Sequence, residues 1–120
     1  MILLTMSEVK SMQINRGEIW SVAWTGFAGK PRPALVIQAE EYRLTETDIL
    51  ALITTTENEA GMLRLLIKAD ESNGLQQDSF ICLDKLMAIP LANLGKCYGK
   101  VSDEVMQEVN TRLTKILGIG

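Results

Sequence analysis

Arg32 is the residue with the most restricted surroundings, because it stands between Pro31 and Pro33 in the segment GKPRPALVIQ, residues 29–38. A proline fixes its own φ and pushes the residue before it toward an extended backbone. The guanidinium therefore enters the strand-forming run at residues 34–37 from a stiff support. Arg32 is either a solvent-exposed arginine at a strand edge or an arginine whose guanidinium is positioned for a function, and the residues alone leave both open.

The residue types that are missing exclude several kinds of chemistry. The 120-residue chain has no histidine, which excludes Ser-His-Asp triads, histidine acid–base catalysis and histidine metal ligands. Its two cysteines, Cys82 and Cys97, form no CxxC pair, so neither a zinc site nor a disulfide framework is predicted. The formal net charge of −3 argues against a broad electrostatic grip on nucleic acid and leaves room only for a local basic groove.

Short strand-forming runs separated by turn residues make up most of the chain, which has the length of one domain. Such runs predict a small antiparallel β-barrel at residues 16–120, after an N-terminal arm at residues 1–15. No apolar run approaches the roughly 20 residues of a membrane span, and the start of the chain does not read as a signal peptide, so a cytoplasmic protein is expected. The predicted strands are residues 17–24, 33–38, 48–56, 62–69 and 78–89.

The C-terminal segment has a helical period instead. Ser102 is the predicted N-cap, Lys115 suits the negative end of the helix dipole, and Gly118 is placed to end the helix. Residues 90–95 predict a helical turn before it. The apolar stripe that predicts an amphipathic helix consists of Val105, Val109, Leu113, Ile116 and Leu117.

Five segments resemble, in the same order, the motifs of the MazF/PemK (Kid) toxin family, and together they cover residues 16–118. Each segment is weak evidence by itself, whereas their order in a chain of this length is specific. The segments are RGEIW (16–20), RPALVIQ (32–38), ALITT (51–55), GLQQDSFICLDKL (74–86) and the tail LGKCYGKVSDEVMQEVNTRLTKILG (94–118).

The resemblance implies an SH3-like barrel with a C-terminal helix, working as a cytoplasmic homodimer. It also implies an endoribonuclease that cuts single-stranded RNA at short sequences without a metal or cofactor. The product ends would be a 2′,3′-cyclic phosphate and a 5′-hydroxyl. A cognate antitoxin would inhibit it by laying an extended segment over the RNA-binding groove.

Three residues match catalytic positions of the family. Arg32 would offer two parallel donors to the phosphate oxygens as charge builds on them. Thr54, on the face of its strand opposite Ile53, would orient the phosphate through its hydroxyl. Asp84 would either take the proton of the 2′-hydroxyl or pair with Arg32 and orient it, and the sequence leaves these two roles open.

Further residues are candidates for RNA contact, each against a plainer alternative. Lys30 lies beside Arg32 and could touch a phosphate, or be a solvated loop lysine. Phe27 could stack on a base, whereas Trp20 and Trp24 share a strand face and are expected in the core. The fallback for Thr54 is Thr55, and Arg64 could line the groove or be a solvated strand edge.

Two departures from the family pattern stand out. Some members have an arginine two residues before the aspartate, where this chain has Cys82, and the loop at residues 25–31 is shorter than the family's usual loop. The alternatives are a CcdB-like toxin that binds gyrase, against which the Trp-free tail TKILGIG argues, and an inactive member that only binds antitoxin.

Overall fold

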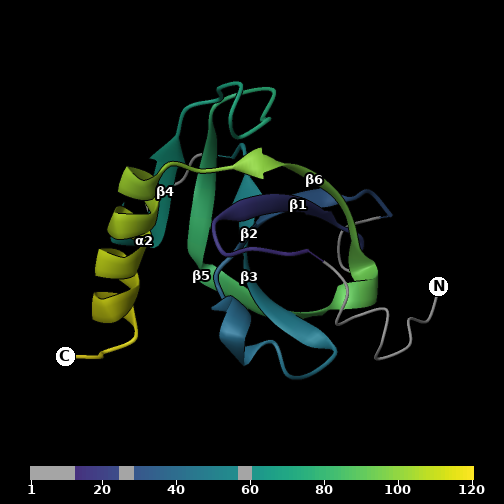
Figure 1. Cartoon of the computed structure of the whole chain (residues 1–120). Helices are drawn as coiled ribbons and strands as arrows, with labels where there is room; N and C mark the ends of the chain where they lie inside the picture. The colour runs from purple at the N-terminus through teal and green to yellow at the C-terminus, as the bar shows by residue number, and fades with distance from the viewer. Residues whose placement is uncertain (1–12, 25–28, 57–60) are drawn as a thin grey trace.

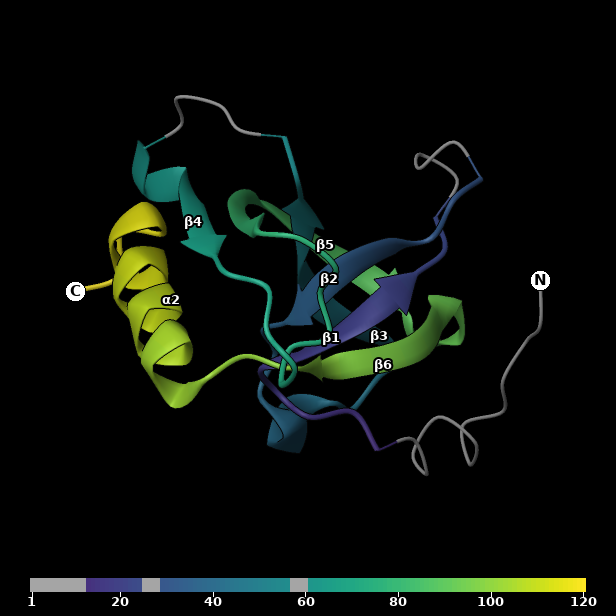
Figure 2. The same cartoon turned by 90° about the horizontal axis from the view of Figure 1, so that it is seen from above.

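One strongly bent antiparallel sheet forms the body of the protein, with the helix α2 along one side of it (Figures 1 and 2). The computed structural model describes residues 13–24, 29–56 and 61–120. The elements are β1 (Glu18–Val22), β2 (Arg32–Val36), the 3-10 turn η2 (Glu40–Tyr42), β3 (Thr47–Thr54), the turn η3 (Gly61–Leu63), β4 (Arg64–Ile67), β5 (Ser79–Pro90), the turn η4 (Leu91–Asn93), β6 (Leu94–Lys100) and α2 (Asp103–Ile116).

The strand order β4-β5-β3-β2-β1-β6 places β2 and β3 in the middle of the sheet. In the residues that the structure describes, β4 and β6 are the two edges, so the sheet curls without closing. The expected mainly β, barrel-like fold with a C-terminal helix is confirmed. The five predicted strands are present within a few residues of their expected bounds.

Both faces of the bent sheet carry a hydrophobic core. On one face, Ile19, Leu35 and Ile81 are fully buried against Val109 and Leu113 of α2. On the other face, the curl of the sheet encloses a second cluster formed by Ile14, Val22, Ala34, Val36, Leu50, Ile89, Leu91 and Leu94. The alternation of buried residues along β1, β2 and β3 thus serves two cores and fixes the register of the central strands.

The helix α2 begins and ends as its sequence predicts. Ser102 is the N-cap, and its hydroxyl accepts a hydrogen bond from the backbone N–H of Val105 at 3.2 Å. Gly118 has a φ of +70°, and the backbone N–H of Ile119 returns to the carbonyl of Thr114 at 2.9 Å. Both ends therefore satisfy backbone groups that the helix itself leaves unpaired.

Strand β6 was missed in the sequence because Gly95 and Gly99 interrupt its apolar pattern. These glycines allow close contacts. A Cβ atom on Gly99 would overlap the carbonyl oxygen of Ser72, which accepts a hydrogen bond from the backbone N–H of Lys100 at 2.9 Å. The loop after β4 is thus pressed against β6, an edge of the sheet far from it in strand order.

The expectation that Trp24 packs into the core is wrong. Strand β1 ends at Val22, and the backbone N–H of Ala23 then donates to the carbonyl of Asn93 at 3.0 Å. The side chain of Asn93 also donates to the carbonyl of Ala23 at 2.7 Å. This turn of the chain toward η4 leaves Trp24 36% exposed, while Trp20 stays half-buried.

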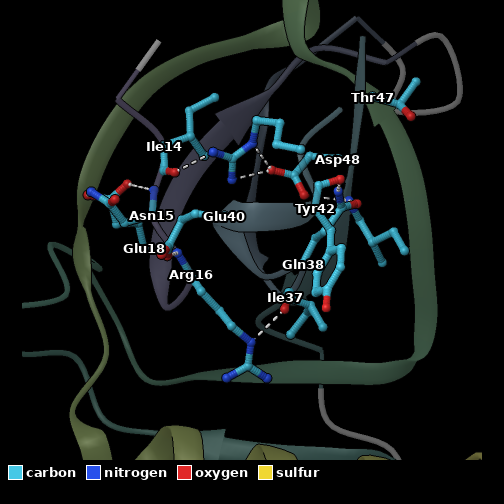
Figure 3. A network of polar contacts seen from close by, with 12 residues as sticks. Ile14, Asn15, Arg16, Glu18, Ile37, Gln38, Glu40, Tyr42, Thr47 and Asp48 are labelled. Carbon is cyan, nitrogen blue, oxygen red and sulfur yellow. Dashed lines mark hydrogen bonds and ion pairs between the residues drawn. The ribbon is translucent and has the colours of Figure 1, made fainter. Parts of the chain in front are cut away.

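A polar network ties residues 14–16 to the sheet (Figure 3). Arg43 donates to the carbonyl of Ile14 at 2.7 Å and forms an ion pair with the fully buried carboxylate of Asp48 at 2.6 Å. Arg16 donates to the carbonyl of Ile37 at 2.6 Å. Ile14, which the sequence assigned to the arm, is therefore part of the packed domain, whereas residues 1–12 lie outside the described residues.

Candidate functional site

Arg32 is the first residue of β2 and is exposed at the end of the sheet. It lies opposite Val22 in the β1–β2 ladder. Glu18, an acid that could pair with Arg32 from the neighbouring strand, lies at the other end of β1 and instead accepts hydrogen bonds from the backbone N–H of Asn15 and the indole of Trp20. In the described part of the chain Arg32 has no ion pair, so its guanidinium is available to a ligand.

Thr54 is the last residue of β3 and is half-buried, opposite Phe80 of β5. The β2–β3 ladder ends at Ala34 and Leu52. Arg32 and Thr54 stand two residues beyond that rung on their own strands, so both side chains point to the same face of the sheet. The Thr54 hydroxyl accepts a hydrogen bond from the N–H of Thr56 at 3.2 Å, which leaves its proton free to donate.

Beside Thr54, strand β5 bulges out of the ladder. Ile53 pairs with Ile81 and Ala51 with Leu86, so Leu52 alone faces residues 82–85 of β5. A bulge re-aims side chains and is frequent next to active sites. Here it carries Cys82 and Asp84, which were predicted to lie in a strand but not in a bulge.

Asp84 is paired with Arg64, not with Arg32. The guanidinium of Arg64 donates through Nε and Nη2 to the two carboxylate oxygens, at 3.0 and 3.3 Å. The Arg64 side chain is only 9% exposed and that of Asp84 is 31% exposed. Arg64 is therefore a held, largely buried guanidinium and not the solvated strand edge that was considered, and the alternative of an Arg32–Asp84 pair is not what the structure has.

Cys82 lies two residues before Asp84 and directly opposite Arg64 in the β4–β5 ladder. Burial raises the pKa of the Cys82 thiol, although the nearby charge of Arg64 opposes the shift. The thiol is protonated at neutral pH and is a poor nucleophile.

The remaining candidates lie around the strand ends. Lys30 and Thr55 are both exposed, the first in the turn before β2 and the second directly after β3. Phe27 lies outside the described residues. The structure thus brings Arg32, Thr54 and Thr55 to one end of the central strands.

A cavity of about 410 Å³ opens beside these strand ends. It reaches under the loop between β4 and β5 and along β6. None of the residues of the loop or of β6 that line it had been predicted as site residues; only the spacing of an exposed lysine and tyrosine in GKCYGK hints at them. The lining consists of Pro33, Thr55, residues 74–77, Ser79, Lys96 and Tyr98.

A protein-family model described as "PemK-like, MazF-like toxin of type II toxin-antitoxin system" matches residues 15–117 of the sequence. The chain belongs to this toxin family. A curated relative, the "Probable endoribonuclease MazF" of Mycolicibacterium smegmatis, is 31% identical over 107 residues, which are 88% of this chain and 98% of the relative. The family resemblance read from the five ordered motifs is confirmed.

Solved structures show the same fold for this MazF-like chain. A mycobacterial endoribonuclease in complex with its cognate antitoxin has a TM-score of 0.71 and 21% identity, over 89% of this chain and 97% of the other. MazE–MazF from Deinococcus radiodurans has a TM-score of 0.73 and 19% identity, over 89% and 97%. The Mycobacterium tuberculosis toxin MazF-mt6 has a TM-score of 0.70 and 23% identity, over 85% and 98%.

The departure of this MazF-like chain at Cys82 has a structural counterpart. Where some members carry an arginine on β5, this chain has a small buried thiol, and Arg64 stands opposite it on β4, paired with Asp84.

Proposed function

We propose that this MazF-like toxin is an endoribonuclease that cuts single-stranded RNA without a metal. The 2′-oxygen of the substrate bonds to phosphorus, the bond from phosphorus to the 5′-oxygen breaks, and the products carry a 2′,3′-cyclic phosphate and a 5′-hydroxyl. The attacking hydroxyl loses a proton and the leaving oxygen gains one, and water at the exposed strand ends can carry both. Family membership and the 31% identical relative support this activity.

The placement of Arg32 and Thr54 is the observation that carries the proposal. Two antiparallel strands bring a hydroxyl and a guanidinium, the latter without an ion pair among the described residues, to one face at one end of the sheet. The guanidinium offers a planar pair of donors to the phosphate oxygens on which charge develops. The hydroxyl donates a further hydrogen bond and fixes the phosphate relative to the attacking oxygen.

Asp84 acts by holding Arg64 rather than as the base. Both its oxygens accept from the guanidinium, which keeps Arg64 extended past Cys82 in the bulge beside Thr54. Arg64 then contributes positive charge close to the cleaved phosphate. Lys30 adds a solvent-exposed contact to a neighbouring phosphate on the substrate strand.

The proposal also includes a cytoplasmic homodimer inhibited by a cognate antitoxin. The mycobacterial and Deinococcus structures contain such an antitoxin partner. In the described residues no helix is long and apolar enough to cross a membrane.

Substitution of Arg32 tests the mechanism. In single-turnover cleavage of a mixed RNA with EDTA present, Arg32→Ala should lower the rate by about 10³-fold, because it removes charge stabilisation in the transition state. Arg32→Lys should recover only a small part of the lost cleavage rate, since an ammonium does not donate in parallel pairs. The matched control is Lys30→Ala, which should weaken RNA binding and leave the rate at saturating toxin unchanged.

Three outcomes would count against the proposal. If antitoxin-free wild type cleaves no RNA, the proposed enzymatic activity is wrong. The protein would then be a toxin that acts by binding a target, and gyrase is the target to test. A requirement for magnesium would remove the metal-free mechanism. A loss below about 100-fold in Arg32→Ala would remove Arg32 from the reaction itself.

A further inference from the structure

The cavity lies at the same ends of β2 and β3 as the proposed phosphate clamp, on the other face of the sheet. Pro33 follows Arg32 and Thr55 follows Thr54, and both line the cavity. Successive strand residues point to opposite faces, so an RNA strand held by Arg32 and Thr54 reaches the cavity by passing around the ends of β2 and β3. Its volume of about 410 Å³ is within the range of sites for small organic ligands, roughly 300–1,000 Å³.

The side chains of the lining suit a nucleotide. Tyr98 offers an aromatic ring and is 37% exposed, and Lys96 on the same strand offers an ammonium. Gln76 and Gln77 on the opposite wall carry amides that both donate and accept hydrogen bonds. An aromatic ring stacks on bases, amides read base edges, and a lysine pairs with phosphate. Among the described residues that line the cavity, none is a carboxylate that would repel the strand.

The wall that carries the two glutamines is fixed before any ligand arrives. Asn73 is 4% exposed, accepts hydrogen bonds from the N–H groups of Asp70 and Leu75 at 3.1 and 3.0 Å, and donates to the carbonyl of Lys68 at 2.9 Å. A Cβ atom on Gly74 would overlap the carbonyl of Tyr98, so the loop lies directly on β6. A wall tied at these points costs little ordering when it binds.

We propose that this cavity is a nucleobase subsite that selects the nucleotide flanking the cleaved bond. Tyr98 stacks on the base, the amides of Gln76 and Gln77 read its edge, and Lys96 pairs with the phosphate of the same nucleotide. The inference rests on the proposed endoribonuclease activity. It adds the position at which the toxin chooses its sequence, and it assigns this choice to the loop and β6 rather than to the shortened loop at residues 25–31.

Photocrosslinking of the wild-type protein tests the subsite without any substitution. The preferred cut is first found with an RNA of random sequence, and the RNA is then made with a 2′-deoxynucleotide at that position so that it stays whole. A 5-iodo- or 4-thio-pyrimidine is placed at each flanking position in turn. We expect a crosslink to Tyr98, identified by mass spectrometry, from one flanking position only.

Cleavage profiles of variants provide the second measurement. Tyr98→Leu should lower cleavage of the preferred sequence about 10- to 100-fold and flatten the preference at the flanking position, because stacking is lost. Gln76→Ala and Gln77→Ala should flatten that preference with smaller rate losses. Lys96→Gln should weaken all sequences alike, as expected of a phosphate contact. The matched controls are Tyr42→Leu, 69% exposed away from the cavity, and Lys100→Gln, which should cleave as wild type does.

The outcomes separate the subsite from the activity. Cleavage by wild type with no crosslink at Tyr98, or with an unchanged sequence profile in Tyr98→Leu, overturns the subsite alone. If wild type cleaves no RNA, the endoribonuclease activity is overturned, and a crosslink from Tyr98 to a random-sequence RNA that contains 4-thiouridine would keep a base-binding cavity. If Tyr98→Leu weakens only antitoxin binding and leaves the RNA profile intact, the cavity holds a peptide and the nucleobase assignment is wrong.

Discussion

Arg32 and Asp84 show how differently two charged residues can be used on one sheet. Arg32 stands at the entrance of β2 between two prolines, exposed and without an ion pair in the described residues. Asp84 is engaged by both its oxygens. An unpaired guanidinium on a stiff backbone needs little reorganisation when charge develops on a phosphate, whereas a carboxylate held by arginine serves to position its partner.

Asp84→Asn distinguishes positioning from base catalysis. If Asp84 only holds Arg64, the amide keeps part of the contact, and the single-turnover rate should fall about 10-fold with an unchanged pH dependence. Arg64→Lys should cost a similar factor, and the double variant should cost little more than either change alone, because both act through one pair. Lys85→Gln, in the same bulge, is the control. A loss of 10²–10⁴-fold with the acidic limb of the pH profile abolished would instead make Asp84 the base.

At the scale of elements, hydrophobic period and caps predicted most of the fold. Ile19, Leu35 and Ile53 lie in three predicted strands and are buried in the first core, and Ser102 and Gly118 mark the helix ends. Arg32 and Thr54 could be chosen as candidates from motifs, and strand alternation gave the face of Thr54.

The remaining features depend on pairing, which one sequence does not encode locally. The bulge at residues 82–85 becomes visible only when β5 is paired with β3, where Leu52 alone faces it. The Arg64–Asp84 ion pair forms only because β4 lies beside β5. Strand β6 was missed because its glycines, which permit close approach of Ser72, weaken the strand signal. The cavity is lined by four separate segments of the chain, so no single motif predicts it.

The contact between the loop and β6 predicts that alanine substitutions at two glycines with nearly the same φ lower the stability by different amounts. Gly74 and Gly118 have φ values of +69° and +70°, but only a Cβ on Gly74 would meet backbone, at the Tyr98 carbonyl. Gly118→Ala should lower the free energy of unfolding by roughly 1 kcal/mol, the cost of the left-handed conformation. Gly74→Ala should cost at least roughly 3 kcal/mol and alter the cavity. Urea unfolding measures both, and equal costs would mean that the loop can move off β6.

At the scale of the whole molecule, one buried ion pair joins the start of the domain to the middle of the sheet. Arg43 bridges the carbonyl of Ile14 and the carboxylate of Asp48 in β3 (Figure 3). Ile14 is 1% exposed in the second core. Folding of the chain start therefore depends on a carboxylate that has lost all contact with water, and this makes stability depend on pH.

Comparison of wild type with Asp48→Asn across pH tests this dependence. Burial raises the pKa of Asp48 in the folded protein above its ordinary value of 3.8, against the lowering effect of Arg43. A raised native pKa means that the folded state holds the proton more tightly. The contribution of this proton to the free energy of unfolding is therefore greatest below about pH 3.8, and it is lost as the pH rises through the pKa of the folded state.

We therefore expect the free energy of unfolding of wild type to fall relative to that of Asp48→Asn as the pH rises through this window, because the amide does not titrate. Urea unfolding at several pH values measures the difference, with the exposed Glu46→Gln as control. The opposite trend, with wild type gaining on the variant as the pH rises, would mean that the ion pair with Arg43 outweighs burial. Asp48 would then strengthen the attachment of Ile14 at neutral pH instead of weakening it.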